Sequence, residues 1–388
     1  MAMMQLPGIA DTEPHHVSER STLADNDQYF LRAPELASVS GATTIRSVDL
    51  FAGCGGLTLG IREACRRLGL GFRSALAIDT APDALDVFEA NFGGQILNAD
   101  VSSVFGGVVG TPPTPSERDI ATSVGSVDFL IGGPPCQGHS DLNNHTRRLD
   151  PKNELYFSMV RAAEVLRPHH VLIENVPAAI NDRAQVVQRT MRQFEELGYM
   201  VDAHVVDASL LGVAQRRRRL VVLASTRMVP SVRFAAARHA TDQRSVDWAI
   251  GDLIDVAGNA LLDESARSEK ETRRRIDVLF DRGLHDLPDD ERPDCHSLRR
   301  HSYRSVYGRL HADEPAPTIT TGFYSMCMGR YVHPTQRRTL TAHEAARIQF
   351  FPDSFDFSSV KKRTALATMI GNAVPSALSR AMACELLQ

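Results

Sequence analysis

Apolar residues in the first part of the chain form short runs, and most runs precede a stretch with apolar positions at helical spacing. The run SVDLF leads through a glycine turn into LTLGIREACRRLG, where Leu57, Ile61, Ala64 and Leu68 recur every three or four residues. Further strand-like runs lie at 75–79, 127–131, 170–176, 199–208 and 219–225. Short apolar strands that alternate with amphipathic helices are typical of an α/β fold with a mainly parallel sheet.

This alternation fails between about residue 227 and residue 330, where Arg, Asp and Pro are more frequent and where the single tryptophan, Trp248, lies. We expect a second, smaller domain there. Helical patterning returns in TLTAHEAARIQFFPD and KRTALATMIGNAVPSALSRAMACELL, whereas the N-terminus has no periodicity. The predicted organisation is a flexible arm at 1–44, a large domain at 45–226, the small domain at 227–320, and a return to the large domain at 321–388.

The composition is that of an ordinary globular chain, with 388 residues, 43% hydrophobic and 23% charged. No apolar segment approaches the roughly 20 residues of a membrane helix, and the N-terminus lacks the basic and then apolar regions of a signal peptide. We therefore expect a cytoplasmic protein that does not bind membranes. The net charge of −4 argues mildly against a nucleic-acid partner, but arginines gather in local runs, above all from Gln215 to Arg219.

The six cysteines are scattered without a C-x-x-C pair, so we expect reduced thiols rather than a disulfide framework. Cys295 and His296, with His301 and His311 downstream, lack a second closely spaced ligand pair, and no metal site is predicted. Among the six cysteines, Cys136 is the candidate for a catalytic residue.

Glycines and carboxylates follow the predicted strands, at the edge where open parallel sheets bind ligands. After the first strand, Gly53 and Gly55 would let a ligand approach the backbone at a helix N-terminus. Asp79, after the second strand, is suited to accepting hydrogen bonds from ribose hydroxyl groups, and Asp100 follows a third apolar segment. The turn lacks the full G-x-G-x-x-G pattern, which favours S-adenosylmethionine over NAD.

Cys136 stands in GGPPCQGHS, directly after the apolar run VDFLI rather than inside it. A nucleophilic thiolate needs partial exposure, and here prolines stiffen the loop while glycines let a flat substrate come close. Glu174 ends the next strand, where a carboxylate must be paired, protonated or functional. His139 raises the alternative of a Cys-His hydrolase, which would explain neither the glycine turn nor the arginines. The pair fits better a thiolate attack on a pyrimidine carbon, with an acid at the ring nitrogen and methyl transfer to the neighbouring carbon.

With these residues in place, the sequence closely resembles the cytosine-5 DNA methyltransferase family. The motifs that carry the resemblance are, in order, DLFAGCGGLTLG, GGPPCQGHS, ENV, QRRRR, RRTLTAHEAARIQFFPD and GNAVP. Their order is that of ordinary bacterial members, and the match covers residues 46–225 and about 305–388. The resemblance implies an α/β fold with a Rossmann-like methyltransferase domain and a smaller target-recognition domain. It also implies DNA (cytosine-5-)-methyltransferase activity with S-adenosyl-L-methionine as cofactor.

The resemblance further implies roles for single residues. Cys136 would attack carbon 6 of cytosine, and Glu174 would hold ring nitrogen 3 and the exocyclic amine. Arg219 would contact the base, and Arg217 would support the site. The residues expected to line the cofactor pocket are Phe51, Gly53, Gly55, Asp79, Asp100, Pro135 and Asn372.

The chain departs from the family pattern at a few positions. Asp79 stands where the family usually has Glu, and Thr80 stands where an aromatic residue often follows. His139 stands where many members have Phe, and His343 where many have Arg. The nucleophile and the carboxylate are both intact.

A base inside a duplex is out of reach of Cys136, so the resemblance implies that cytosine is flipped out of a short double-stranded DNA site. The arginine runs would bind phosphates, while the small domain would read base edges in the major groove. A cognate restriction endonuclease is a candidate partner, and monomeric action is expected. Two alternatives stay open. One is a tRNA cytosine-5 methyltransferase, although TTGFYSMCMGRY lacks the Cys-Phe-Thr tripeptide typical of that branch. The other is a catalytically silent protein that binds DNA or S-adenosylmethionine.

Overall fold

The computed structural model describes residues 26–36, 39–135, 155–181, 185–254, 256, 258–294 and 306–388. A seven-stranded sheet forms its centre, with the strand order β3-β2-β1-β4-β5-β8-β6. The strands are β1 (Thr44–Leu50), β2 (Gly71–Asp79), β3 (Gln95–Asn98), β4 (Phe129–Gly132), β5 (His170–Asn175), β6 (Met200–Asp207) and β8 (Arg218–Ser225). Most of them coincide with apolar runs of the sequence, because strands covered on both faces need apolar side chains on both.

Neighbouring strands of this sheet are parallel except at β8, which is antiparallel to both β5 and β6. The predicted mainly parallel α/β fold is therefore confirmed, with one reversed strand. β1 and β4 are neighbours at the centre, where Leu50 pairs with Gly132. From β1 the strand order runs outward to β3, and from β4 it runs outward on the other side. The carboxyl ends of β1 and β4 thus form the switch point at which open α/β sheets bind ligands.

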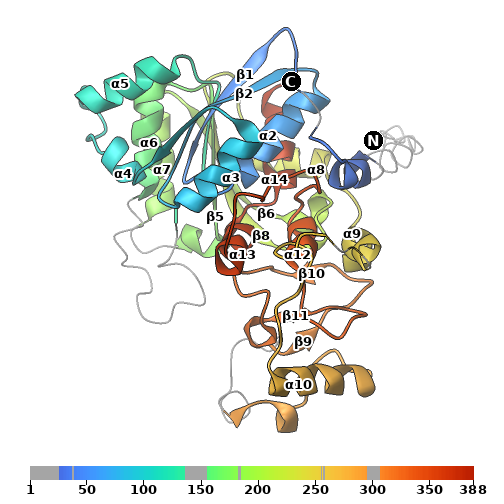
Figure 1. Cartoon of the computed structure of the whole chain (residues 1–388). Helices are drawn as coiled ribbons and strands as arrows, with labels where there is room; N and C mark the ends of the chain where they lie inside the picture. Colours follow the sequence, from blue (N-terminus) through green and yellow to red (C-terminus); the bar gives the residue numbers. More distant parts are fainter. Residues whose placement is uncertain are drawn as a thin grey trace, which may run out of the picture.

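Helices cover both faces of the sheet, and alternate strand residues enter two apolar cores (Figure 1). In β4, Phe129 and Ile131 belong to one core and Leu130 to the other. The covering helices are α2 (Gly56–Arg67), α3 (Pro82–Phe92) and α14 (Ser376–Leu386) on one face, and α4 (Val101–Val104), α5 (Pro115–Val124), α6 (Leu155–Leu166) and α7 (Val186–Glu196) on the other. Within the described ranges, no helix is long and apolar enough to span a membrane.

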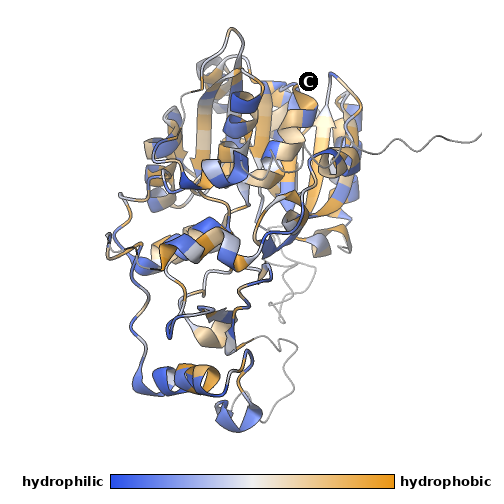
Figure 2. Ribbon diagram, turned by 90° about the vertical axis from the view of Figure 1, so that its right-hand side faces the viewer, coloured by the Kyte–Doolittle hydropathy of each residue, from blue (hydrophilic) through white to orange (hydrophobic). Residues whose placement is uncertain are grey.

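A smaller unit lies beyond one end of the sheet and has its own apolar core (Figure 2). It contains α10 (Lys270–Asp281), β9 (Gly308–Arg309), η6 (Met326–Met328) and β11 (Arg330–Val332). Its core residues are Ile276, Leu279, Leu287, Val306, Tyr307, Met326 and Val332.

The expected start of the small domain at residue 227 is too early for this separate core. α8 (Val232–Arg238) and α9 (Val246–Ile250) follow that residue, but their apolar side chains enter the core of the large unit. α8 packs on α14 and β6, and α9 packs on α12 (Ala342–Ile348). The chain therefore leaves the large unit only after these two helices.

The expectation of a flexible N-terminal arm is wrong for residues 26–32, which form a helix packed on the large unit. Leu31 is fully buried, and the buried carboxylate of Asp27 accepts hydrogen bonds from Arg67 Nη2 at 2.7 Å and Arg380 Nη1 at 2.8 Å. Seven residues are too few for a helical period to stand out in the sequence, so only these tertiary partners reveal the segment. The first 25 residues of the expected arm lie outside the described residues.

Candidate active site

Glu174 lies near the carboxyl end of β5 and is buried, with 8% of its surface exposed. Its Oε1 is 2.7 Å from Arg219 Nε, which reaches it from the neighbouring antiparallel strand β8. Burial raises the pKa of Glu174, and the nearby Arg219 and Arg217 lower it by less, so the net shift is upward from the ordinary value of 4.5. The site therefore contains a carboxyl group that holds its proton more firmly than an exposed glutamate.

Arg217 is buried behind this pair and is bonded mainly to backbone. Its Nη1 donates to the Ile319 carbonyl at 2.9 Å and its Nη2 to the Gly371 carbonyl at 3.2 Å, whereas its Nε has no hydrogen-bond partner among the described residues. Burial, reinforced by the positive charge of Arg219, lowers the pKa of Arg217 to about 9. Arg217 thus joins two backbone segments next to Glu174 and Arg219, without a direct ion pair to Glu174 among the contacts described, and its supporting role in catalysis stays a prediction.

Two buried glutamines join the segments that meet at Arg217. Gln215, in β7 (Gln215–Arg216), donates from Nε2 to Gln349 Oε1 at 2.8 Å and accepts the Ile319 amide at 2.8 Å. Gln349 in turn donates from Nε2 to the Ile370 carbonyl at 2.6 Å. The junction fixes β7, the backbone at Ile319 and the C-terminus of α13 (Arg363–Asn372) relative to one another. Sequence reasoning missed Gln349, because a polar residue at the end of an amphipathic helix carries no signal of its tertiary partner.

The loop expected to carry the nucleophile begins beside Glu174. A Cβ placed on Gly133 would lie 3.3 Å from Glu174 Oε2, so the backbone of the loop passes directly over the carboxylate. Asn175, the next residue of β5, donates from Nδ2 to the Pro134 carbonyl at 3.0 Å and holds the loop in that place. Pro135 is partly exposed at the end of this stretch. Cys136 and His139 lie outside the described residues. The pairing of Cys136 with Glu174 therefore stays a prediction.

The glycine turn after β1 has one open side and one packed side. Phe51, Gly53 and Gly55 all have positive φ, at 59°, 53° and 91°. A Cβ on Gly53 would meet no atom within 4 Å, whereas a Cβ on Gly55 would lie 2.3 Å from the ring of Phe92. A ligand could therefore approach the backbone at Gly53, while Gly55 allows the turn to pack tightly on α3.

One predicted carboxylate contacts this turn, and a second follows the neighbouring strand β3. Asp79 Oδ2 accepts the Gly53 amide at 2.8 Å and its Oδ1 accepts the Ala81 amide at 2.9 Å. Because each carboxylate oxygen has two lone pairs, Asp79 can still accept hydrogen bonds from a diol. Asp100, beyond β3, is exposed and caps α4 by accepting the Ser102 amide at 2.8 Å.

The last predicted cofactor residue, Asn372, reaches the same turn from the far end of the chain. Cys54 Sγ is 4.0 Å from the Met369 carbonyl, and a Cβ on Gly56 would lie 2.5 Å from the Val374 carbonyl. Asn372, exposed at the end of α13, lies between these two contacts. A backbone open to a ligand, diol acceptors at two strand ends and a turn after β1 that lacks the third glycine of the dinucleotide-binding pattern fit S-adenosylmethionine.

Asp49 is a second buried carboxyl group that sequence reasoning did not select. It lies in β1, accepts the Thr58 hydroxyl at 2.7 Å, and has its pKa raised by burial to about 8. An acidic residue inside the apolar run SVDLF was the available signal. Asp49 is buried in the core behind the glycine turn.

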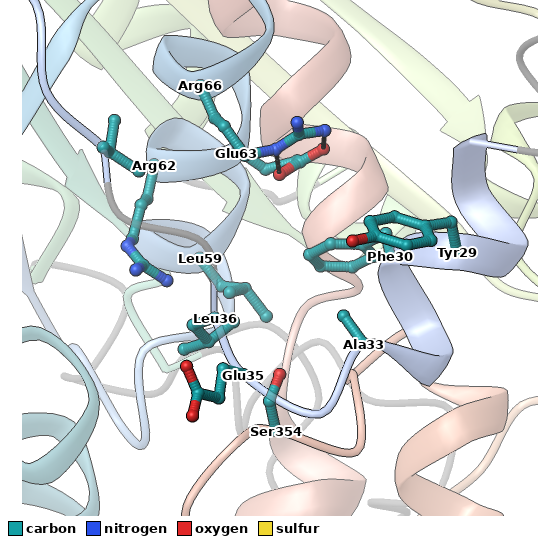
Figure 3. Close-up of a pocket in the computed structure, with 11 residues that line it drawn as sticks. Tyr29, Phe30, Ala33, Glu35, Leu36, Leu59, Arg62, Glu63, Arg66 and Ser354 are labelled. Atoms are coloured by element: carbon teal, nitrogen blue, oxygen red, sulfur yellow. Dashed lines mark hydrogen bonds and ion pairs between the residues drawn. The ribbon is translucent and has the colours of Figure 1, made fainter.

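A further cavity lies away from these residues, between the 26–36 segment and α2 (Figure 3). Tyr29, Leu36, Leu59 and Ser354 are among the residues that line it. Glu63 in its wall accepts both Arg66 Nε and Arg66 Nη2 at 2.7 Å. None of the residues predicted for catalysis or cofactor binding lines this cavity.

Comparisons with known proteins agree with this geometry. Residues 45–388 match the family model of the C-5 cytosine-specific DNA methylases. The chain is 44% identical over 364 residues to the type II methyltransferase M1.BsuMI of Bacillus subtilis (strain 168), covering 93% of this chain and 85% of the relative. It is 30% identical over 356 residues to the type II methyltransferase M1.HphI of Haemophilus parahaemolyticus, covering 88% and 86%. The crystal structure of the S. pombe Dnmt2 methyltransferase superposes with a TM-score of 0.60 at 16% identity, over 88% of this chain and 98% of that one, and so supports the fold.

Proposed function

The chain belongs to the C-5 cytosine-specific DNA methylases, and on that premise we propose that Cys136, Glu174, Arg217 and Arg219 carry out its reaction. The protein transfers a methyl group from S-adenosylmethionine to carbon 5 of cytosine in a specific DNA sequence. The observation that carries the proposal is the buried ion pair of Glu174 and Arg219 beneath the start of the Cys136 loop.

The first step is the addition of the Cys136 thiolate to carbon 6 of the cytosine ring. The electron pair of the C5=C6 bond shifts to form a C4=C5 bond, the pair of the C4=N3 bond moves onto nitrogen 3, and Glu174 gives a proton to that nitrogen, where negative charge would otherwise develop. The raised pKa of Glu174 suits this role, because a carboxyl group can donate a proton only while it still holds one. Arg219 fixes the carboxyl group and contacts the base, and Arg217 keeps Arg219 and the adjoining backbone in position.

The second half of the reaction restores the ring. When bound, S-adenosylmethionine would supply the methyl group to carbon 5, with S-adenosylhomocysteine as the leaving group. Carbon 5 then loses its hydrogen as a proton to a base, the C5=C6 double bond forms again, and the Cys136 thiolate leaves carbon 6. Nitrogen 3 returns its proton to Glu174, so the protein ends the cycle in its starting state.

The methyl donor would be held at the carboxyl ends of β1, β2 and β3. Asp79 would accept the ribose hydroxyl groups, with Asp100 beside it. The open backbone at Gly53 would let the ligand lie against Phe51, and Gly55 would keep the turn packed on α3. Pro135 and Asn372 would close the pocket from the nucleophile loop and from α13.

Double-stranded DNA would bind between the large unit, proposed as the catalytic domain, and the small unit, proposed as the target-recognition domain. Flipping the cytosine costs a few kcal/mol, which phosphate contacts from arginines would offset. Arg274, in the arginine run 273–275 of α10, is already bonded to Glu271 at 2.8 Å and to Glu291 at 2.6 Å, so this run contributes less charge than its sequence indicates. Arg299 and Arg300 lie outside the described residues.

We further infer that the protein acts as a monomer in the cytoplasm and that a cognate restriction endonuclease is its biological partner. The names of both curated relatives, which are type II methyltransferases, support the second inference. Measurement of the protein's size in solution tests whether it is a monomer. A search for an endonuclease activity of the same cell that cleaves unmethylated DNA tests for the restriction partner.

Labelled S-adenosylmethionine tests the proposed residues and the choice of substrate together. The wild-type protein and Cys136→Ser are each incubated with mixed genomic DNA and, separately, with tRNA. We expect label in DNA with wild type, and none with Cys136→Ser. Label in tRNA alone would move the function to RNA, and label with Cys136→Ser equal to wild type would exclude Cys136 as the nucleophile.

A further inference from the structure

His343, in the first turn of α12, lies between two carboxylates from different segments. Its Nδ1 is 2.8 Å from Asp263 Oδ1, and its Nε2 is 2.8 Å from Asp353 Oδ1. Only 15% of the His343 side chain is exposed. A neutral imidazole has a hydrogen on one nitrogen alone, and would leave the other nitrogen facing a carboxylate without a proton. Both contacts are satisfied together only by the imidazolium form.

The charged groups around the ring favour that form. Burial lowers the pKa of His343, but the hydrogen bonds and charges of Asp353 and Asp263 raise it by more, so the net shift is upward from 6.5. Arg347 of α12 binds Asp353 through Nε and Nη2. Beyond it, Asp252 of η4 (Gly251–Leu253) lies 3.4 Å from Arg347 Nη1. Asp353 is thus shared between two cations, whereas Asp263 depends on His343.

The residue that His343 holds on one side organises a tight turn at 259–264. Asp263 Oδ2 accepts the Asn259 amide at 2.8 Å, and Asn259 Oδ1 accepts the Leu261 amide at 2.9 Å. The backbone amide of His343 adds a bond to the Leu262 carbonyl at 3.0 Å. This turn is therefore tied to α12 through both the side chain and the backbone of one residue.

The same turn is the point at which the chain leaves the large unit. α9 and η4 before it belong to the large unit, and α10, which begins at Lys270, belongs to the small unit. From α13, Arg363 Nη2 also donates to the Ala260 carbonyl at 2.7 Å. The turn thus stands at one of the crossings between the two units, fixed to both α12 and α13.

We propose that His343 is a positioning residue for DNA binding, which fastens the 259–264 turn to α12 through both ring nitrogens and so holds the small unit in its binding orientation. This inference rests on the proposed function in one respect, because it takes the small unit as the part that reads DNA. Loss of the ring proton breaks one of the two bonds and frees the turn. DNA binding should then depend on pH in a way that a permanent cation at position 343 would not.

The test compares His343→Gln and His343→Arg with wild type, and uses His204→Gln, an exposed histidine on β6, as the matched control. The readouts are the dissociation constant of a fluorescein-labelled duplex made from the methylated sequence, and hydrogen exchange at the Leu261 and Asp263 amides in the absence of DNA. Both are measured from about pH 6 to about pH 9, which brackets the ordinary histidine pKa.

We expect His343→Gln to bind the duplex about tenfold more weakly than wild type near pH 6, the scale of one charge-assisted hydrogen bond. Wild type should lose affinity relative to His343→Arg as the pH rises, and its Leu261 and Asp263 amides should exchange faster after correction for intrinsic rates. Wild-type affinity in His343→Gln, or a constant ratio between wild type and His343→Arg across the range, would overturn the proposal.

The exchange measurement keeps this test separate from the proposed function. It needs no DNA and no variant, so it reports on the turn even if a substituted protein fails to fold or the protein methylates another substrate. Unchanged exchange of the two amides across the titration of His343 would contradict the proposal by itself. Methylation of tRNA with pH-dependent exchange would instead overturn the choice of substrate and leave the role of His343 in the turn intact.

Discussion

Replacing Glu174 by glutamine removes the ionisable carboxyl group from the buried end of β5 while keeping the length and shape of the side chain. The amide cannot give a proton to nitrogen 3 of cytosine, so the addition of Cys136 loses its general acid. Such a loss typically costs roughly 10²- to 10⁴-fold in rate, which is about 3–5 kcal/mol of barrier. We expect kcat to fall by this factor.

The cost in stability should be smaller, and the structure explains why. Among the described residues, Glu174 pairs with Arg219 Nε at 2.7 Å, and the Arg219 side chain keeps 14% of its surface exposed. The glutamine oxygen can still accept the hydrogen bond from Arg219. The variant therefore loses only the charge contribution to this one contact, which should lower the free energy of unfolding by about 1–2 kcal/mol. The variant should therefore fold and bind S-adenosylmethionine, and yet be almost inactive.

Glu117→Gln is the matched control for this variant. Glu117 is also a buried carboxylate, but it lies in α5 and accepts Arg161 Nη2 at 2.7 Å and Arg161 Nε at 2.9 Å, as well as two backbone amides. Weakening a buried ion pair of this kind costs up to about 3–5 kcal/mol, so the control should lose more stability than Glu174→Gln and keep its kcat.

The assay measures kcat at saturating duplex DNA and S-adenosylmethionine, together with the free energy of unfolding in urea. A kcat for Glu174→Gln within a few-fold of wild type would refute the reasoning, because a general acid cannot be dispensable. An equal fall of kcat in both variants would also refute it, by assigning the effect to stability.

Buried polar contacts elsewhere in the molecule can be tested in the same way. Gln349→Leu should raise the KM for S-adenosylmethionine and destabilise the fold by about 1–3 kcal/mol, since it leaves Gln215 Nε2 unbonded; unchanged KM and unfolding curves would contradict this. Asp27→Asn should lower the urea midpoint by removing the anion that Arg380 faces, and an unchanged midpoint would show the N-terminal helix to be dispensable. Burial lowers the pKa of His170 from 6.5 to about 4, so its contribution to stability should be complete above about pH 6.5 and lost as the pH falls toward 4; His170→Phe should flatten that slope in thermal melting.

Hydrophobic patterning predicted the main strands and helices because both faces of the sheet are covered, which makes the strands apolar throughout. It could not predict that β8 runs antiparallel, since an apolar run has no direction. It also assigned α8 and α9 to the small domain, because charged and proline-rich neighbours mask the few apolar residues that enter the large core.

The candidate site was predictable to the extent that its residues stand at strand ends. Glu174 and Arg219 are far apart in the sequence, and the motifs that contain them placed both at the edge where the sheet now brings them to 2.7 Å. Asn175 and Gln349 were not predictable, because their roles consist of bonds to the Pro134 and Ile370 carbonyls, which only the folded chain brings near.

The most direct measurement is covalent capture of the intermediate on duplex DNA that contains 5-fluorocytosine in the methylated sequence. Fluorine replaces the hydrogen that must leave carbon 5, so the thiolate cannot be released after methyl transfer. We predict a denaturation-resistant complex whose digested peptide carries the DNA on Cys136, formed by wild type, slowly by Glu174→Gln, and not at all by Cys136→Ser. Attachment through another residue, or a complex of equal yield with Cys136→Ser, would contradict the central claim that Cys136 and Glu174 together perform the reaction.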